Sequence, residues 1–371
     1  MPVPTLDPLT RPQRDTLLRD TAVPVPSPAP AAARHVGRQE TSPHLWGIIL
    51  AGGDGQRLWP LTQVYCGSAR PKQYCTFFGN RSLLRQTLGR AEQLIPAARL
   101  LTVVTQCHLA YAREELSDRA PETVIIQPCN RDTGAGILLP LLHIVQRDPA
   151  AIVALFPSDH FILEEQPFMA TVATAVASLA THPRHLVVLG VTPDGPEVEY
   201  GWIGTGNMLG QVGGTAVYQV QHFWEKPTLG VAEYLYRHQA LWNTLVLVGH
   251  AGVLLELFKT LTPDLYTPFG RCREVLGAPH ELQVLQEVYA TLPVVNFSRA
   301  ILAQSAPCLG VLPVHGIHWS DWGSPARVLQ DIVRYHLGDP SRADGPHSRA
   351  CRWSCGAQAP HRVPPARCPG G

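Results

Sequence analysis

Residues 45–60 have the sequence LWGIILAGGDGQRLWP, a short apolar run that leads directly into a glycine-rich turn. The apolar run ends at Leu50 and has the length of a buried parallel strand, so the glycines fall where a strand passes into the next element. Glycines there let backbone N–H groups approach phosphate oxygens without interference from a Cβ atom. Two cations follow, Arg57 and, within the stretch Arg70-Pro71-Lys72-Gln73, Lys72. The pattern predicts a loop that surrounds a polyphosphate.

Two well-known phosphate-binding loops fit this stretch poorly. The dinucleotide fingerprint G-x-G-x-x-G would need a third glycine at the position of Leu58. The Walker A loop would need a lysine followed by serine or threonine at a fixed spacing, and this stretch has none. A glycine turn with two solvated cations and no ligand remains as the alternative.

The composition excludes several classes of protein. The 371 residues are 45% hydrophobic and 16% charged, enough for a sizeable core in one large or two modest domains. A net charge of +1, with basic residues scattered along the chain, gives no electrostatic basis for binding nucleic acid. No apolar stretch approaches the ~20 residues that span a bilayer, and the N-terminus lacks the pattern of a signal peptide. We therefore expect a cytoplasmic protein without a membrane or nucleic-acid partner, whose nine cysteines are reduced thiols.

Both ends of the chain depart from a globular composition. Residues 1–43 contain nine prolines and are expected to form a flexible arm. Residues 338–371 are again rich in Pro, Arg, Ser and Gly, which predicts a second, low-complexity arm. The spacing Cys351-x3-Cys355 in that arm lacks the paired pattern of a structural zinc site. Residues 44–337 are left as one domain.

Within this domain, strand-like and helix-like stretches alternate. Short, β-branched apolar runs predict strands at residues 100–105, 123–126, 151–156 and 185–190. Longer amphipathic stretches predict helices at residues 82–94, 110–117, 134–145 and 167–180. This alternation predicts an α/β domain with a largely parallel sheet, which binds ligands at the carboxyl ends of its strands.

A carboxylate follows the strongest apolar strand, in the stretch Phe156-Pro157-Ser158-Asp159-His160. Polyphosphate chemistry usually needs Mg2+, a hard ion that prefers carboxylates, phosphates and water. Asp159 is therefore a candidate metal ligand, although an aspartate taken alone is more often a turn or helix-cap residue. His160 has three interpretations: it orients Asp159, lines the pocket, or is a structural histidine.

The combined pattern G-G-x-G-x-R-L-x-P…P-K resembles the sugar-1-phosphate nucleotidyltransferases, and residues 57–60 with 71–73 are most similar to their mannose-1-phosphate guanylyltransferase branch. Three later segments resemble family motifs in family order. Residues 200–203 are similar to Y-G-Y-I, residues 223–227 to F-x-E-K-P, and residues 319–324 to W-x-D-x-G-s. The resemblance covers about residues 45–335. It implies a Rossmann-like (GT-A-like) α/β domain with a mixed, mostly parallel central sheet flanked by helices.

The resemblance also implies roles for individual residues. Arg57 and Lys72 would be the catalytic cations, and Asp159 and Asp321 would hold Mg2+. The nucleotide would be bound by Leu50, Ala51, Gly52, Gly53, Gly55, Arg57, Lys72 and Ser158. The sugar phosphate would be bound by Tyr200, Gly201, Glu225, Lys226 and Asn243.

Three positions depart from the family pattern. Trp202 replaces the second tyrosine of Y-G-Y-I, and Leu245 stands where W-N-x-G has glycine. Asp132 replaces an asparagine in residues 127–136, which resemble a P-x-x-R-N-T-A-P-A segment near the nucleotide. Leucine would crowd a close backbone approach, and a carboxylate would repel a triphosphate unless a cation screens it.

The implied reaction is nucleotidyl transfer from a nucleoside triphosphate, GTP, to a hexose 1-phosphate, mannose 1-phosphate. Two alternatives stay open: glucose 1-phosphate with UTP or dTTP as the substrate pair, and a catalytically idle regulatory homologue that binds a nucleotide sugar. Only a short apolar stretch, residues 328–337, follows Asp321, so we expect neither the small β-helix nor the cupin-like isomerase domain of many relatives. The sequence leaves open whether the protein is a monomer or a homodimer.

Overall fold

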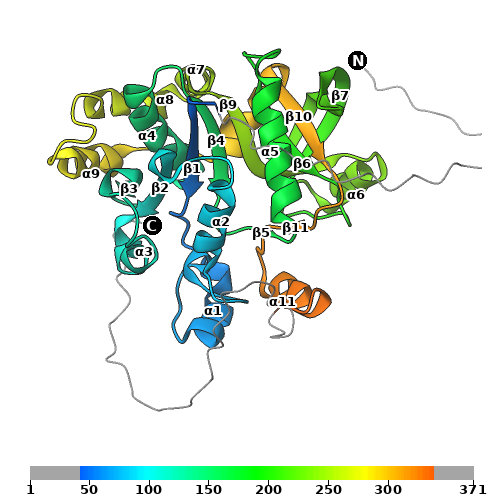
Figure 1. Cartoon of the computed structure of the whole chain (residues 1–371), viewed down its shortest axis with the longest axis horizontal. Helices are drawn as coiled ribbons and strands as arrows, with labels where there is room; N and C mark the ends of the chain where they lie inside the picture. The colour runs from blue at the N-terminus through cyan, green and yellow to red at the C-terminus, as the bar shows by residue number, and fades with distance from the viewer. Residues whose placement is uncertain (1–41, 338–371) are drawn as a thin grey trace, which may run out of the picture. The chain divides into compact units, whose positions relative to one another are not determined.

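A nine-stranded mixed sheet runs through residues 42–337, the part of the chain that the computed structural model describes (Figure 1). Its strands follow the order β3-β2-β1-β4-β9-β6-β10-β8-β7, and β9 also pairs with β7. A separate two-stranded sheet joins β5 (Phe161–Ile162) to β11 (Trp319–Ser320). The arms expected over residues 1–43 and 338–371 lie outside the described residues, apart from residues 42 and 43.

Four neighbouring strands of the sheet are parallel. They are β1 (Leu45–Leu50), β2 (Leu100–Thr105), β3 (Val124–Gln127) and β4 (Ile152–Pro157). Adjacent residues of a strand face opposite sides of a sheet, and both Ile48 and Ile49 are fully buried. Strand β1 is therefore covered on both faces, which explains its uninterrupted apolar sequence.

The remaining strands run in mixed directions. Strand β9 (Leu241–His250) is antiparallel to its neighbours β4 and β6 (Leu186–Val191), and β10 (Leu309–Val314) is parallel to β6. Strands β7 (Gly201–Val212) and β8 (Thr215–Glu225) form an antiparallel hairpin. The hairpin turns through Gly213 and Gly214, both of which have positive φ.

Helices cover both faces of the sheet. One apolar cluster joins Ile48 to residues of α4, α7 and α9, and another joins Ile49 to residues of α2 and α5. Helix α5 packs on β6 and β10 (Figure 1). The α-helices of the described residues are α1 (Trp59–Cys66), α2 (Leu83–Ala91), α3 (Leu109–Glu115), α4 (Asp132–Arg147), α5 (Glu165–Ser178), α6 (Leu229–Arg237), α7 (Ala251–Leu261), α8 (Pro263–Tyr266), α9 (Glu281–Thr291), α10 (Phe297–Ala300) and α11 (Pro325–Arg334).

The fold predicted from the sequence is confirmed: a mixed sheet with a parallel core, flanked by helices. The strands predicted at residues 45–50, 100–105, 123–126, 151–156 and 185–190 correspond to β1, β2, β3, β4 and β6. The four predicted helices correspond to α2, α3, α4 and α5. None of the helices described for this chain is both long enough and apolar enough to cross a membrane.

A third apolar cluster brings the C-terminal end of the described chain back to the region after the glycine turn. The Trp322 side chain is fully buried and stacks on Phe161, with ring centroids 4.7 Å apart. Asp331 of α11 accepts a hydrogen bond from Trp322 Nε1 at 2.8 Å, and its other carboxylate oxygen lies 3.0 Å from His318 Nε2. These contacts fix the segment that contains Asp321.

Replacing Asp331 should destabilise the fold. Asp331→Ala leaves the buried Trp322 indole N–H without its acceptor, so we expect the free energy of unfolding to fall by about 1–3 kcal/mol. Urea denaturation followed by tryptophan fluorescence measures the change. Glu256→Ala, which removes an exposed carboxylate of α7, is the control and should shift stability by less than about 0.5 kcal/mol. Equal stability of the two variants would contradict an anchoring role for Asp331.

Candidate functional site

The glycine loop, residues 51–55, is held by Gln73 and Tyr74. Gln73 Nε2 donates hydrogen bonds to the carbonyl oxygens of Ala51 (3.1 Å) and Gly53 (2.8 Å), and the Tyr74 hydroxyl donates to Ala51 O at 3.0 Å. Within the described residues, four N–H groups of the loop donate no hydrogen bond, those of Gly52, Gly53, Asp54 and Gly55. The loop can therefore offer backbone donors to an anion.

Gly55 brings the loop against the second motif. Its φ of 58° and ψ of 26° lie in the left-handed region, which glycine adopts readily. A Cβ atom at this position would lie 3.3 Å from the backbone nitrogen of Lys72, closer than a side chain packs comfortably. The two halves of the sequence motif are thus in contact.

Lys72 is the buried cation of the site, with only 6% of its surface exposed. Its Nζ atom lies 3.3 Å from Asp159 Oδ2 and donates hydrogen bonds to the carbonyl oxygens of Asp321 and, at 3.2 Å, Trp322. The structure therefore brings together three residues that the sequence separates widely: Lys72, Asp159 and Asp321.

The two predicted metal ligands have oxygen atoms suited to a hard cation. Burial acts to raise the pKa of Asp159, but the charge of the Lys72 ammonium and its hydrogen bond act in the opposite direction, and the pKa lies below its usual range. Asp321 Oδ1 accepts hydrogen bonds from the Tyr200 hydroxyl at 3.0 Å and from the Gly323 N–H at 2.7 Å. Both side chains thus offer carboxylate oxygens, the donors that Mg2+ prefers.

His160 packs beside this pair. Its Nε2 lies 3.7 Å from Asp159 Oδ1, and its ring meets Trp319 edge-on with centroids 5.2 Å apart. Burial lowers the pKa of His160, although the carboxylates of Asp159 and Asp321 act in the opposite direction. A neutral, packed imidazole agrees with the structural interpretation of this histidine.

On the exposed side of the site, Glu199 joins two predicted cations. Arg57 Nη1 donates to Glu199 Oε2 at 2.9 Å, and Lys226 Nζ lies 3.5 Å from the same oxygen. The Arg57 hydrogen bond and the Lys226 charge lower the pKa of Glu199. No role was expected for Glu199 from the sequence. Its position directly before Tyr200-Gly201 was the available signal.

The predicted sugar-binding residues converge where β7, β8 and β9 meet. Gly201 pairs with Glu225 across the hairpin. A Cβ atom on Gly201 would lie 3.0 Å from Glu225 Oε2 and 3.2 Å from Asn243 Cβ. This close approach explains the glycine.

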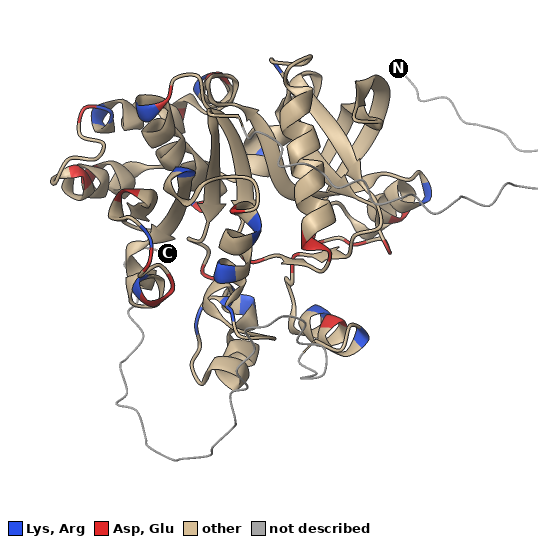
Figure 2. Ribbon diagram, in the orientation of Figure 1, with Lys and Arg blue, Asp and Glu red and all other residues tan. Residues whose placement is uncertain are grey.

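Glu225 stands out by its charge. The strands are otherwise free of charged side chains: among Asp, Glu, Lys and Arg, Glu225 is the one that falls within a strand of the described chain (Figure 2). Burial raises its pKa, against the opposing influence of Lys226 and Arg299, and nearby Asp132 raises it further. A half-buried carboxyl at a strand end, among mixed charges, is typical of a binding site rather than of a surface ion pair.

Leu245 affects the site through the backbone. Its φ of 56° is left-handed, a conformation that glycine adopts freely and a branched side chain does not. The Leu245 side chain packs against the core, and its N–H donates to Asn243 Oδ1 at 3.1 Å. The structure thus adds a local backbone constraint on Asn243, and the crowding of the sugar pocket expected from the sequence stays a prediction.

Asp132 also has a left-handed backbone, with φ of 64°. Its carboxylate accepts a hydrogen bond from the Thr133 N–H and one of 3.4 Å from Asn296 Nδ2, while its own N–H donates to Asn130 Oδ1 at 2.9 Å. These donors partly neutralise the carboxylate that the sequence analysis expected to repel a triphosphate.

Tyr200, whose hydroxyl donates to the Asp321 carboxylate, lies in an aromatic group. Its ring packs against Trp242 and Trp319, with centroids 4.8 and 5.1 Å away. Trp202, which replaces a family tyrosine, is instead fully buried and donates from Nε1 to Glu197 O at 2.8 Å. The tryptophan substitution thus belongs to the core.

A cavity of about 460 Å³ adjoins the glycine loop. Its lining includes Leu50, Gly52, Gly53, Asp54, Gln127, Asn130, Asp132 and Gly136. Gln127 is oriented by a hydrogen bond of 3.0 Å from the Tyr289 hydroxyl to its Oε1. A second cavity, of about 490 Å³, is lined by residues 78–81, 86 and 161–167 and includes none of the predicted site residues. The cavity beside the loop is therefore the candidate binding site.

Ser158 and Leu50 were predicted to contact the nucleotide. Both the N–H (3.1 Å) and the hydroxyl (2.6 Å) of the fully buried Ser158 donate to Leu50 O. Ser158 thus joins the ends of β1 and β4, and a direct contact of its hydroxyl with a nucleotide stays a prediction.

Known proteins share this sequence and architecture. The profile of the family described as Nucleotidyl transferase matches residues 46–266, more than half of the chain. Mannose-1-phosphate guanylyltransferase 2 of Escherichia coli O157:H7 is 28% identical over 310 residues, which cover 80% of this chain and 62% of the relative. Xanthan biosynthesis protein XanB of Xanthomonas campestris pv. campestris strain B100 is 29% identical over 303 residues, which cover 80% of this chain and 61% of the relative. The chain thus spans about three fifths of the length of these relatives.

A solved structure agrees with this match. The crystal structure of mannose-1-phosphate geranyltransferase from Thermus thermophilus is 28% identical and superposes with a TM-score of 0.63, covering 76% of each chain. The family profile spans the glycine loop, Lys72, Asp159 and the predicted sugar-binding residues of β7, β8 and β9. The glycine loop and its buried lysine therefore sit in a chain that belongs to the nucleotidyl transferase family.

Proposed function

We propose that this protein transfers a guanylyl group from GTP to mannose 1-phosphate, giving GDP-mannose and pyrophosphate. The observation that supports this most directly is the position of Lys72, buried between Asp159 and the backbone of Asp321 and Trp322, beside a glycine loop with unused N–H groups. The relatives named as mannose-1-phosphate guanylyltransferases support the choice of substrates.

In the proposed reaction, a phosphate oxygen of the sugar phosphate attacks the α-phosphorus of the triphosphate. The bond between that phosphorus and the bridging oxygen to the β-phosphate breaks, and pyrophosphate leaves. No covalent enzyme intermediate is needed, so catalysis rests on positioning and on neutralising charge. The N–H groups of Gly52, Gly53 and Gly55 hold the triphosphate, and Lys72 stabilises charge near the α-phosphate.

Asp159 and Asp321 are the residues that would hold Mg2+, because both offer carboxylate oxygens and the pKa of Asp159 keeps it ionised at neutral pH. A bound Mg2+ would neutralise phosphate charge and reduce repulsion between the two anionic substrates. Lys72 supports this arrangement, since it contacts the carboxylate of Asp159 and the backbone carbonyl of Asp321.

The two substrates occupy opposite sides of the loop in this proposal. The cavity of about 460 Å³ accommodates the nucleoside. Glu225 and Asn243 hydrogen-bond the sugar hydroxyls beside Gly201, and Tyr200 closes that side. Lys226 binds the sugar phosphate, and Arg57 binds the β- and γ-phosphates once both have left Glu199.

Pyrophosphate release tests the proposal. The purified full chain, with Mg2+, is assayed with GTP, UTP, dTTP, ATP and CTP, each against mannose 1-phosphate and glucose 1-phosphate. We expect release with GTP and mannose 1-phosphate. Release only with glucose 1-phosphate and UTP or dTTP would reject the substrate assignment while keeping the reaction class.

A binding protein without turnover is the second candidate. The left-handed backbones of Leu245 and Asp132, two departures in substrate-facing segments, are the observations that favour it. Folded protein that releases no pyrophosphate from any pair, yet binds GDP-mannose in calorimetry, would establish this alternative.

We expect Arg57 to contribute to turnover and not to the stability of the fold. Because its side chain is 63% exposed and contacts only Glu199 among the charged groups of the described residues, Arg57→Ala should leave the melting temperature nearly unchanged. Loss of a cation that stabilises the leaving group should lower kcat about 10²-fold or more. Arg271→Ala, which removes a similarly exposed arginine paired with Glu287, is the control and should retain full activity. Normal turnover by Arg57→Ala would contradict the assigned role.

Glu199 should compete with phosphate for its two cations. Glu199→Gln keeps the shape but removes the charge, so we expect the KM for the triphosphate to fall about two- to fivefold, with kcat changed less than about twofold. Steady-state kinetics at low ionic strength give both constants, and the difference should shrink at high salt. A rise in KM would instead show that Glu199 contacts a substrate directly.

A further inference from the structure

A cluster of potential metal ligands lies beside the glycine loop, apart from Asp159 and Asp321. Asp54, Cys107 and His108 each offer one donor atom, and these three atoms lie within 4.8 Å of one another. Within residues 42–337, this is the one group of three or more such side chains with that spacing. Asp54 belongs to the glycine loop. Cys107 and His108 belong to the single turn, Gln106–His108, that joins β2 to α3.

The distance between the donor atoms of Asp54 and His108 suits a tetrahedral metal ion. Asp54 Oδ1 lies 3.3 Å from His108 Nε2. Two donor atoms placed about 2.0–2.1 Å from a tetrahedral zinc ion are themselves about 3.3 Å apart. The Cys107 sulfur lies within 4.8 Å of the donor atoms of the other two residues and 3.4 Å from Thr105 Oγ1, which places it for a third ligand position.

The surrounding contacts orient these ligands. His108 Nδ1 lies 2.7 Å from Thr105 Oγ1, which holds the ring with Nε2 toward Asp54. Asp54 Oδ2 accepts a hydrogen bond of 3.1 Å from Asn130 Nδ2, so Oδ1 is the carboxylate oxygen that faces the histidine. Outer contacts of this type fix the ring orientation and the basicity of metal ligands.

A simple ion pair accounts for only part of this arrangement. Asp54 and His108 would suffice for such a pair. The Cys107 sulfur, the third donor atom of the group, is the additional feature that points to a metal ion. It lies beside His108, which is only 7% exposed.

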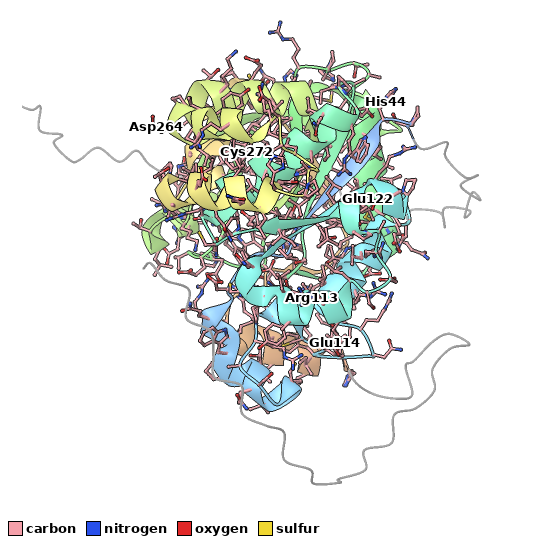
Figure 3. The ribbon with its side chains drawn as sticks, turned by 90° about the vertical axis from the view of Figure 1, so that its left-hand side faces the viewer. His44, Arg113, Glu114, Glu122, Asp264 and Cys272 are labelled. Carbon is pink, nitrogen blue, oxygen red and sulfur yellow. The ribbon has the colours of Figure 1, made fainter. Side chains whose placement is uncertain are left out.

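We infer that Asp54, Cys107 and His108 form a binding site for Zn2+. Mixed nitrogen, sulfur and oxygen donors favour zinc over the hard ion Mg2+. The ion would connect the glycine loop to the turn before α3, the helix that contains the labelled residues Arg113 and Glu114 in Figure 3. Because Asp54 also lines the cavity beside the loop, occupancy would restrain one wall of that cavity. The inference does not depend on the proposed reaction.

Cobalt and zinc binding test the site directly. The full chain is stripped with EDTA, exchanged into chelator-free buffer and titrated with Co2+, followed by Zn2+ competition. We expect a near-ultraviolet thiolate-to-cobalt band that Zn2+ abolishes. Cys107→Ser should remove the band and weaken Zn2+ binding more than tenfold. Thr105→Val, which removes the contact to His108 Nδ1, should weaken binding about 10–100-fold.

Two controls separate this site from the other cysteines. Cys308→Ser replaces a half-buried cysteine elsewhere in the described chain, and the double variant Cys351→Ser/Cys355→Ser removes two cysteines of the C-terminal arm. Both should keep the cobalt band and the wild-type affinity. A band that disappears in the double variant but persists in Cys107→Ser would overturn the inference.

A measurement on the wild-type protein covers the case in which a variant does not fold. Bound Zn2+ should protect Cys107 from iodoacetamide at least severalfold, as measured by peptide mass spectrometry, while Cys308 reacts equally with and without the ion. Equal alkylation of Cys107 in both conditions, or no cobalt band in folded wild-type protein, would overturn the site. Neither the cobalt band nor the alkylation of Cys107 involves catalysis. Failure of the metal site can therefore be distinguished from failure of the proposed reaction.

Discussion

The buried ammonium of Lys72 is the constraint on which the candidate site depends. Its Nζ atom is surrounded by the Asp159 carboxylate and by backbone carbonyls of Asp321 and Trp322, so that Lys72 joins two segments far from it and from each other in the sequence. An unpaired charge at this depth would cost several kcal/mol, so each of these segments must be in position for the others to fold correctly. The aromatic packing around Trp322 and the glycine loop against Lys72 both follow from this requirement. The same contacts that stabilise the fold therefore position the Asp159 carboxylate and the backbone of Asp321 around one ammonium group.

The exposed side of the site follows a different electrostatic rule. Arg57 and Lys226 share one oxygen of Glu199, and all three side chains are substantially exposed. Exposed ion pairs contribute little to stability and exchange readily with other anions. Buried charge thus fixes the geometry around Lys72. The exposed side chains of Arg57, Lys226 and Glu199 can instead change partners when a phosphate binds.

How much of the fold and of the candidate site could be predicted from the sequence depends on how far apart in the chain the interacting residues lie. Strand β1 and the strand at residues 100–105 were identified from local apolar runs, because strands buried on both faces are apolar throughout. Lys72, Asp159 and Asp321 were identified from family motifs, and the structure places them in contact. The antiparallel insertion of β9 between β4 and β6 was not foreseen, since strand pairing is set by non-local contacts that no short pattern encodes. Glu199 and the group of Asp54, Cys107 and His108 were missed for the same reason: their partners come from other loops.

Leu245 illustrates how one departure from the family pattern can change specificity without blocking a pocket. A leucine in the left-handed region is strained by about 1–2 kcal/mol relative to glycine, and packing of its side chain against the core offsets that cost. Its N–H occupies one lone pair of Asn243 Oδ1, so the amide presents its NH2 group as the principal contact to a ligand beside Glu225. Burial raises the pKa of the neighbouring Glu225 carboxyl. If the two residues bind a sugar as proposed, this pair would favour a hydroxyl that accepts a hydrogen bond from Asn243 and donates one to Glu225. In the proposed sugar site, the substitution would therefore act on which sugar hydroxyl is recognised, because the backbone constraint decides which atoms of Asn243 remain available.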